Sequence, residues 1–482
     1  MKESEKKELN LRDILLRDSF TASEKLHFIA LFLVLIILSW SLNNQSIWVS
    51  SFIFLIGLTS IFNLKIHDIT NPFIIDKLWK KYFYYNIPAL IILFIYLLGS
   101  LDEALVKVSI NEEEYLLLSS PNWLGSTITF KETCIFFLGS IFSFSLVTQI
   151  LIIPKSLHFI SKFLFWCSIN ALLSGIIGFI FKAANLSKPL FTTGTKQGDY
   201  FSFFPYDSDW ACFALLWMFV SYGLAKVEFI KNKNALLRSN TSILLSACII
   251  LGLSGIIVEP SFASLALILS FAYLCKDCVK NFGKFDPVFN QIKPYILGLI
   301  IGSISYGIYI LNKLNFLDST VLHLRESSLA MISDNYLFGW GTHSFQKLLP
   351  FYSNNNLLNR NYESVPSSVL NFIVEYGFVG FIAIISYICF FFIKYYLKKQ
   401  KNDFSDTLFI GLFLIVLISF FENTFYNSAV SFSFLLISFF AIRWSLLIYK
   451  RVDEVDTNNH LITKDTLRNV PVVTNPKKEI FK

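Results

Sequence analysis

The stretch FIALFLVLIILSW, Phe28 to Trp40, decides the fold class, because none of its side chains is charged. Similar apolar stretches recur along the chain, many of them about 17 residues or longer, which is the length that spans a bilayer as a helix. The chain has 482 residues, of which 54% are hydrophobic and only 16% are charged. A soluble domain of this length would need more charge to cover its surface. The sequence therefore predicts an all-α fold, a polytopic bundle of transmembrane helices.

Hydropathy predicts about twelve membrane spans. They are expected to begin near Phe28, Ile47, Tyr82, Ile135, Phe159, Trp210, Ile243, Phe262, Ile296, Val369, Leu408 and Ala429. The segment from Ile243 to Leu274 has a second interpretation, one helical hairpin that turns at Glu259-Pro260, because the apolar run after the proline is short. The charged N-terminal stretch Met1–Lys25 leads straight into an apolar run, which is not the pattern of a cleavable signal peptide.

The distribution of basic residues predicts the orientation, since cytoplasmic connections of membrane proteins are enriched in lysine and arginine. Every second connection is basic, through Lys65, Lys77, Lys80, Lys81, Lys155, Lys226, Lys231, Lys233, Arg238, Lys276, Lys280, Lys284, Lys394, Lys398, Lys399 and Lys401. The alternate connections are acidic or neutral, as at Asp102 and Glu103. Both termini are therefore expected in the cytoplasm. The same bias explains the net charge of +7, so no nucleic-acid partner is expected.

The chain divides into a membrane part, residues 1–449, and a polar tail, residues 450–482, which is expected to be cytoplasmic and disordered because it lacks hydrophobic periodicity. Three external segments are too long for simple turns: Leu101–Lys131, Lys182–Asp209 and Asn312–Ser368, the last between spans nine and ten.

The seven cysteines fall in or beside apolar runs and are interpreted as small core residues. The CxxC pair Cys275 and Cys278 has no second pair and no histidine nearby, so no metal site is predicted.

The segment Asn312–Ser368 contains the stretch YLFGWGTHSF, residues 336–345. Arg325 lies on an amphipathic helical pattern just before it. Gly339 and Gly341 are expected to end that helix, because glycine permits positive φ angles and close backbone approach. The chain then returns to the membrane through LNFIVEYGFVG, residues 370–380, which places Glu375 about two turns inside the tenth span.

This region resembles the signature region of the O-antigen ligase/polymerase superfamily. The family pattern is an arginine, a short helix, a G-W-G-x-x-S-F turn, a polar stretch and then L-x-x-x-x-E-x-G-x-x-G entering a membrane helix. The matching residues are Arg325, Gly339, Gly341, Ser344, Phe345, Leu370, Glu375, Gly377 and Gly380, so the signature covers about residues 320–385. A second match is GTKQGDYFSFFPYDSDWACFAL, residues 194–215, where Lys196 stands near the family's basic position and Asp207 or Asp209 where an amide is usual.

The resemblance implies an enzyme at the external face of a bacterial inner membrane. Such an enzyme transfers a glycan from a polyprenyl-pyrophosphate carrier to an acceptor hydroxyl. In a polymerase the acceptor is the end of another carrier-linked glycan, and in a ligase it is the lipid A core or a protein. The resemblance implies neither a nucleotide sugar, nor a metal, nor another cofactor. Between these activities, an O-antigen or exopolysaccharide polymerase is preferred over a ligase.

The chemistry of this transfer selects candidate residues. Negative charge develops on the departing diphosphate, and arginine offers a planar fork of donors for phosphate oxygens while lysine offers a point charge. The external cations that fit are Arg325, Arg360, Lys347 and Lys196. The acceptor hydroxyl needs a base, for which His343 and His323 titrate in the right range. The carboxylates near external helix ends are Glu375, Glu422, Asp207, Asp209 and Glu259, and Glu375 is expected to lie deepest.

One departure from the family pattern bears on the base. Ligases carry a His-Asn pair just before the leucine of the second motif, and Pro366 and Ser367 occupy those positions here. The candidates for the base are therefore Glu375 and His343, with a slight preference for Glu375. The structural interpretation of the glycines is simpler: Gly339 and Gly341 form a turn, and Gly377 and Gly380 allow helices to pack closely.

Two other functions fit a polytopic membrane protein. The first is a transporter that flips lipid-linked oligosaccharides, and the second is a non-catalytic assembly partner that keeps the fold. Transporters often show internal repeats and charged residues deep in several spans, whereas the polar residues here gather in one external segment. This pattern favours an enzyme that works at the external face.

Overall fold

The computed structural model describes residues 20–41, 47–70, 80–91, 105–110, 113–118, 130–153, 156–184, 186, 200–231, 239–282, 287–314, 319–341, 344–353, 364–396 and 402–466. Almost all of these residues are helical. The long helices are α2 (Ala22–Trp40), α3 (Ile47–Thr70), α5 (Phe130–Ile152), α6 (Leu157–Ala183), α7 (Asp207–Lys231), α8 (Ser239–Ile257), α9 (Phe262–Phe282), α10 (Pro287–Lys313), α13 (Ser368–Tyr396), α14 (Asp403–Ser419) and α15 (Ser428–Thr466). Residues 80–91 are also helical.

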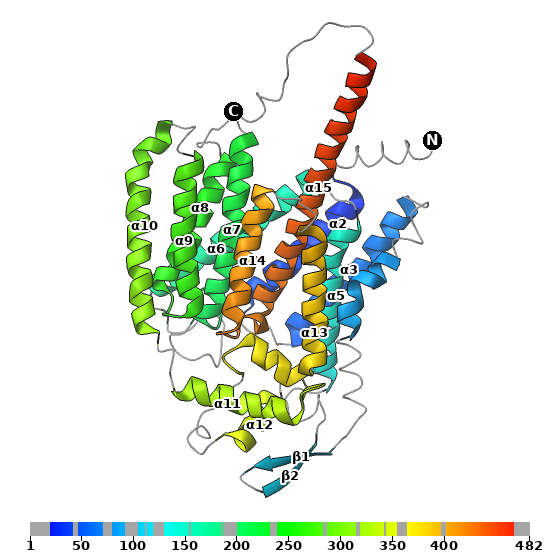
Figure 1. Ribbon diagram of the computed structural model, residues 1–482, viewed down its shortest axis with the longest axis vertical. Helices are drawn as coiled ribbons and strands as arrows, with labels where there is room; N and C mark the ends of the chain where they lie inside the picture. The colour runs from blue at the N-terminus through cyan, green and yellow to red at the C-terminus, as the bar shows by residue number, and fades with distance from the viewer. Residues whose placement is uncertain are drawn as a thin grey trace.

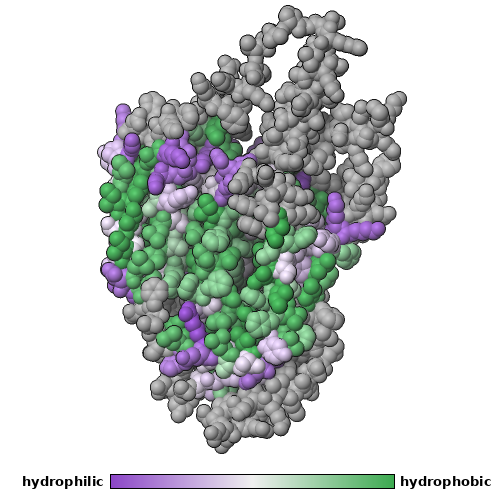
Figure 2. Space-filling view, viewed as in Figure 1, coloured by the Kyte–Doolittle hydropathy of each residue, from purple (hydrophilic) through white to green (hydrophobic). Residues whose placement is uncertain are grey.

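The described residues include eight helices that are long and apolar enough to cross a membrane, namely α2, α6, α7, α8, α9, α10, α13 and α15. A polytopic, membrane-embedded helix bundle is thus confirmed, while the count of twelve spans stays a prediction. Figure 2 shows the apolar surface as a band between hydrophilic residues towards the upper and lower ends. The turn expected at Glu259-Pro260 separates α8 from α9, and each of these two helices is long enough to count as a candidate span.

Helix α7 lies at the centre of the bundle, where 78% of its most apolar window is buried. Its tryptophans Trp210 and Trp217 are fully buried, and the Trp210 ring stacks on Phe201 with centroids 4.8 Å apart. Both indole N–H groups donate to serines, to Ser254 on α8 and to Ser433 on α15. Bulky aromatic rings fill this core, and the indole N–H groups of these two tryptophans are satisfied by hydroxyls on neighbouring helices.

Two short helices and a hairpin lie at the lower end of the bundle in Figure 1. The helices are α11 (Ser319–Asp334) and α12 (Phe345–Tyr352), both in the segment between α10 and α13. The hairpin consists of β1 (Leu105–Ile110) and β2 (Glu113–Leu118), which pair antiparallel with Leu105 opposite Leu118. The predominantly helical fold is confirmed, and the strands at residues 105–110 and 113–118 are an exception that the sequence analysis did not predict. This short run is rich in residues that favour strands, among them Val106, Val108 and Tyr115.

The last helix extends beyond the membrane part of the chain. Helix α15 continues to Thr466, whereas disorder was expected from Lys450 onward. No proline or glycine interrupts the sequence between Ser428 and Thr466, so nothing in the backbone chemistry ends the helix earlier. Residues 467–482 lie outside the described part of the chain.

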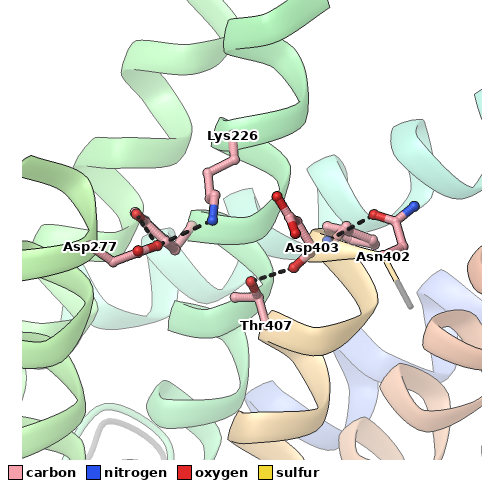
Figure 3. A network of polar contacts seen from close by, with 7 residues as sticks. Lys226, Asp277, Asn402, Asp403 and Thr407 are labelled. Atoms are coloured by element: carbon pink, nitrogen blue, oxygen red, sulfur yellow. Dashed lines mark hydrogen bonds and ion pairs between the residues drawn. The ribbon is translucent and has the colours of Figure 1, made fainter. Parts of the chain in front are cut away.

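At the upper end of the bundle, polar contacts join α7 to α9, and others lie within the first turn of α14 (Figure 3). The Lys226 ammonium forms an ion pair of 3.2 Å with the Asp277 carboxylate, which also accepts a hydrogen bond of 2.8 Å from the Tyr222 hydroxyl. Asn402 caps α14 by accepting from the amide of Phe404 at 3.0 Å. These contacts have structural roles and lie at the opposite end from α11 and α12 (Figure 1).

Candidate functional site

The stretch Tyr336–Gly341, hereafter the glycine turn, binds directly to a break in α13. Gly377 has a φ of 64° and a ψ of −175°, which interrupts the helix. Two helical hydrogen bonds are lost there, since the amides of Phe378 and Val379 can no longer reach the carbonyls of Val374 and Glu375. Figure 1 shows the part of α13 before the break lying across the lower end of the bundle and the part after it running along the bundle.

The glycine turn supplies a partner for each of the four freed backbone groups. The amide of Trp340 donates to the carbonyl of Val374 at 2.8 Å, and the amide of Gly341 donates to that of Glu375 at 2.9 Å. In the other direction, the Phe378 amide donates to the Tyr336 carbonyl at 2.8 Å and the Val379 amide to the Leu337 carbonyl at 3.1 Å. Two carbonyls before the break and two amides after it are therefore paired with a segment about 40 positions earlier in the sequence.

The glycines are required by this close approach. Gly339 and Gly341 have φ angles of 72° and 93°, which confirms that they form a turn with positive φ. A Cβ at Gly339 would lie 2.6 Å from the amide nitrogen of Gly377, and a Cβ at Gly377 would meet the carbonyl of Leu337. The expectation that Gly377 serves helix packing is wrong, because this residue breaks the helix and receives the turn. Gly380 is buried within the second part of α13.

Glu375 lies two residues before the break and is only 3% exposed. It was expected about two turns inside a continuous span, whereas it lies at the end of a separate helical segment, residues 368–376. The Tyr426 hydroxyl lies beside its carboxyl group and beside the side chain of Asn371. Tyr426 belongs to the short 3-10 helix η2 (Thr424–Tyr426) between α14 and α15. Burial raises the pKa of the Tyr426 hydroxyl well above its ordinary value, and the neighbouring Glu375 charge adds to this effect.

Arg325 lies on α11, and its side chain is half-buried. Its Nε is buried without a hydrogen-bond partner among the described residues. The neighbouring residue Leu324 belongs to a buried cluster that also contains Val374, the neighbour of Glu375. The other members of this cluster are Met331, Ile332, Trp340, Phe345, Leu348, Leu349, Val365 and Ile373. The cluster thus joins α11, the glycine turn, α12 and the first part of α13 into one packed unit.

Several predicted site residues lie outside the described part of the chain. These are His343, Arg360 and Lys196. Lys347 lies in α12, but its side chain is not described. His323 is exposed on α11 and pairs with Glu326 at 3.2 Å, in the same helix.

The other predicted carboxylates hold helix ends together at the lower end of the bundle. The Asp207 carboxylate lies 3.6 Å from the Lys182 ammonium and accepts from the amide of Glu259 at 3.0 Å. The Asp209 carboxylate accepts from the side-chain amide of Asn427 at 3.0 Å. These contacts bind the start of α7 to the ends of α6 and α8 and to the start of α15, so both aspartates have structural roles.

Glu422 caps a neighbouring helix. Its Oε1 accepts from the backbone amides of Phe262 and Ala263, the first residues of α9, where the partial positive charge of the helix terminus favours a carboxylate. Its Oε2 is buried without a hydrogen-bond partner among the described residues. Burial raises the pKa of Glu422 from its ordinary value of 4.5 to about 7, against the opposing effect of the two amides.

Pro366 and Ser367, which stand where the family carries its His-Asn pair, directly precede α13. Ser367 is buried, and its hydroxyl accepts from the amide of Leu370 at 3.4 Å and donates to the carbonyl of Ser419 at 3.4 Å. The adjacent Ser368 binds the backbone of Glu422 and Phe425. These residues anchor α13 to the end of α14 and to the connection between α14 and η2.

A cavity of about 500 Å³ lies among α5, α13, α14, α15 and the helix of residues 80–91. Its wall is almost entirely apolar, with Phe144, Phe372, Ile384, Leu412 and Phe439 among the lining residues. Tyr376, the neighbour of Glu375, also lines this cavity. An apolar chain of a lipid fits such a wall, and the cavity reaches the same segment of α13 that carries Glu375.

Sequence reasoning missed Tyr426 and Asn371. Asn371 precedes Glu375 by four residues and lies on the same helical face, so the helical period could have revealed it. Tyr426 carries no comparable signal, because only the tertiary fold brings η2 beside α13. Comparison of the sequence with models of known protein families gives no match, and comparison with curated protein sequences gives none either.

Proposed function

We propose that the chain is a membrane glycosyltransferase that transfers a polyprenyl-pyrophosphate-linked glycan to an acceptor hydroxyl. The site is the packed unit of α11, the glycine turn and α13, and it faces the exterior of a bacterial inner membrane, with both termini in the cytoplasm. A polymerase that joins carrier-linked glycans is preferred, and an O-antigen ligase acting on the lipid A core comes next.

The observation that carries this proposal is the half-buried Arg325. A buried guanidinium donor without a protein partner is costly, so an anionic ligand is its natural complement. The Arg325 guanidinium then binds the diphosphate of the carrier, with Arg360 or Lys196 assisting. The apolar cavity beside Tyr376 supports a lipid-linked donor, because it offers the polyprenyl chain a place next to the same segment.

In the transfer step, the bond between the sugar C1 and the diphosphate oxygen breaks, and a bond between C1 and the acceptor oxygen forms. The diphosphate leaves with the bonding electron pair, and Arg325 stabilises its growing negative charge. The acceptor hydroxyl gives its proton to a base, for which Glu375 and His343 are the candidates. The Tyr426 hydroxyl, which lies beside both Glu375 and Asn371, orients the Glu375 carboxyl group.

The experiment is to express Arg325→Ala and the matched control Glu326→Ala in cells that lack the native chain. Glu326 follows on the same helix, and its side chain is 72% exposed. We expect short glycans and lipid-linked units on the external face with Arg325→Ala, and full-length glycans with the control. Full-length glycans with Arg325→Ala would overturn the proposal. Lipid-linked units that accumulate only on the cytoplasmic face would identify a transporter instead.

A further inference from the structure

Three consecutive apolar side chains at the start of the glycine turn are exposed. Tyr336 is 54% exposed, Leu337 46% and Phe338 50%. They lie in a segment that sequence patterns place outside the membrane. Adjacent exposed large apolar residues in such a segment mark a surface that binds another apolar phase. Residues Tyr336–Phe338 are called the tip below.

The tip lies against the outer surface of a candidate membrane span. Its first two carbonyls accept from the amides of Phe378 and Val379 at 2.8 and 3.1 Å, at the start of the second part of α13. The side chains of these two residues are exposed as well, at 40% and 37%. Ile382, one turn further along the same helix, is 58% exposed. The tip and this helix therefore form one continuous apolar surface.

Two of the three carbonyls of the tip and two neighbouring polar side chains have hydrogen-bond partners within the protein. Besides the two bonded carbonyls, the side-chain amide of Asn335 donates to the carbonyl of Gly339 at 2.7 Å. The Asp334 carboxylate accepts from the Tyr352 hydroxyl at 2.7 Å. Backbone enters a bilayer at low cost only where its polar groups are paired within the protein, and this condition is met for the carbonyls of Tyr336 and Leu337.

We propose that the tip inserts into the lipid leaflet at this end of the bundle and anchors the loop between α10 and α13 to the membrane. Its partner is the acyl-chain region of phospholipids, and Tyr336 lies nearest the headgroups because its phenol combines an apolar ring with a polar hydroxyl. The anchor holds the glycine turn at a fixed depth. This proposal does not depend on the glycosyltransferase activity.

The test uses the full chain in vesicles of zwitterionic and anionic phospholipid, with a spin label on one introduced cysteine. The variants Leu337→Cys and Phe338→Cys report on the tip. The control is Ser333→Cys, an exposed position in the last turn of α11. The unsubstituted protein, with its seven native cysteines, is labelled in parallel and its signal is subtracted. The rate at which the spin label collides with each of two reagents is measured. The reagents are oxygen, which concentrates in lipid, and a water-soluble nickel complex.

At both tip positions we expect oxygen to collide more often than the nickel complex, with the reverse order at Ser333→Cys. Equal access of the nickel complex to the tip and to the control would overturn the proposal. Exclusion of both reagents from the tip would show that protein covers it, which would also overturn the proposal. Two tip positions are used, so that poor folding of one variant leaves the other to decide.

Discussion

Gly339 and Gly377 approach so closely that neither has room for a Cβ: one added to Gly339 would lie 2.6 Å from the Gly377 amide nitrogen. The pair joins the glycine turn to the break in α13, and both residues have positive φ. The turn, the break and the position of Glu375 therefore form a single structural feature. Its stability can be tested by adding one methyl group at a time.

Gly377→Ala is expected to destabilise the fold by roughly 2–4 kcal/mol, from a left-handed backbone conformation and a clash with the Leu337 carbonyl. Gly339→Ala should act similarly. The control is Gly298→Ala on α10, where a Cβ meets nothing within 4 Å, and its effect should be within about 1 kcal/mol. Unfolding in mixed micelles monitored by circular dichroism measures the difference. Equal stability of the Gly377 and Gly298 variants would contradict the close approach.

Arg325→Ala should lower transfer activity by about 10- to 100-fold at normal protein level, since a charge-assisted hydrogen bond contributes roughly 1.5–3 kcal/mol. Arg325→Lys should restore only part of the activity, because lysine keeps the charge but lacks the planar fork. Glycan length on gels, normalised to the amount of protein in the membrane, is the measurement. Full restoration by lysine would show that charge alone matters at this position.

Glu375→Gln should abolish transfer and leave carrier binding measurable if Glu375 accepts the acceptor proton. Tyr426→Phe removes only the neighbouring hydroxyl, so it should shift the pH profile of transfer without abolishing the reaction. Binding of a fluorescent carrier analogue and single-turnover transfer distinguish the two effects. Normal transfer by Glu375→Gln would remove this residue as the base and leave His343 to be tested by the same substitution.

Glu422 should make the stability of the fold depend on pH. Its pKa is about 7 in the folded protein against an ordinary value of 4.5, so the folded state binds the proton more tightly. The resulting stabilisation is complete below about pH 4.5, falls as the pH rises towards 7, and is absent above that value. Glu422→Gln should flatten this dependence, because its amide oxygen still accepts from the α9 amides without a buried charge. Melting temperatures between pH 5 and 8 test this, with the exposed Glu326→Gln as the control.

The orientation can be tested with one cysteine at each end of the bundle. Ser333→Cys on α11 should react with a membrane-impermeant thiol reagent in cells whose outer barrier is opened, and Lys280→Cys in the last turn of α9 should react only after lysis. The native exposed Cys389 sets the background. The opposite pattern would place α11 in the cytoplasm and reverse the proposed side of the site.

The sequence by itself determined that the chain is helical and membrane-embedded. Long apolar runs must bury their backbone polar groups within a helix, and this requirement is local. The positions of α11 and of the α8–α9 turn were predictable for the same reason, as were the positive φ angles at Gly339 and Gly341. The residue types of the candidate site, an arginine and a carboxylate in one signature region, could also be predicted from the sequence.

Only the tertiary structure decided how these pieces meet. Gly377 breaks α13 because the glycine turn replaces two helical hydrogen bonds with four bonds to a distant segment, and no local pattern encodes that exchange. The same contact moves Glu375 to a helix end. The fold, through η2, brings Tyr426 beside Glu375, although 51 positions separate them in the sequence. Local chemistry fixes which backbone groups need partners, whereas packing selects the partners they find.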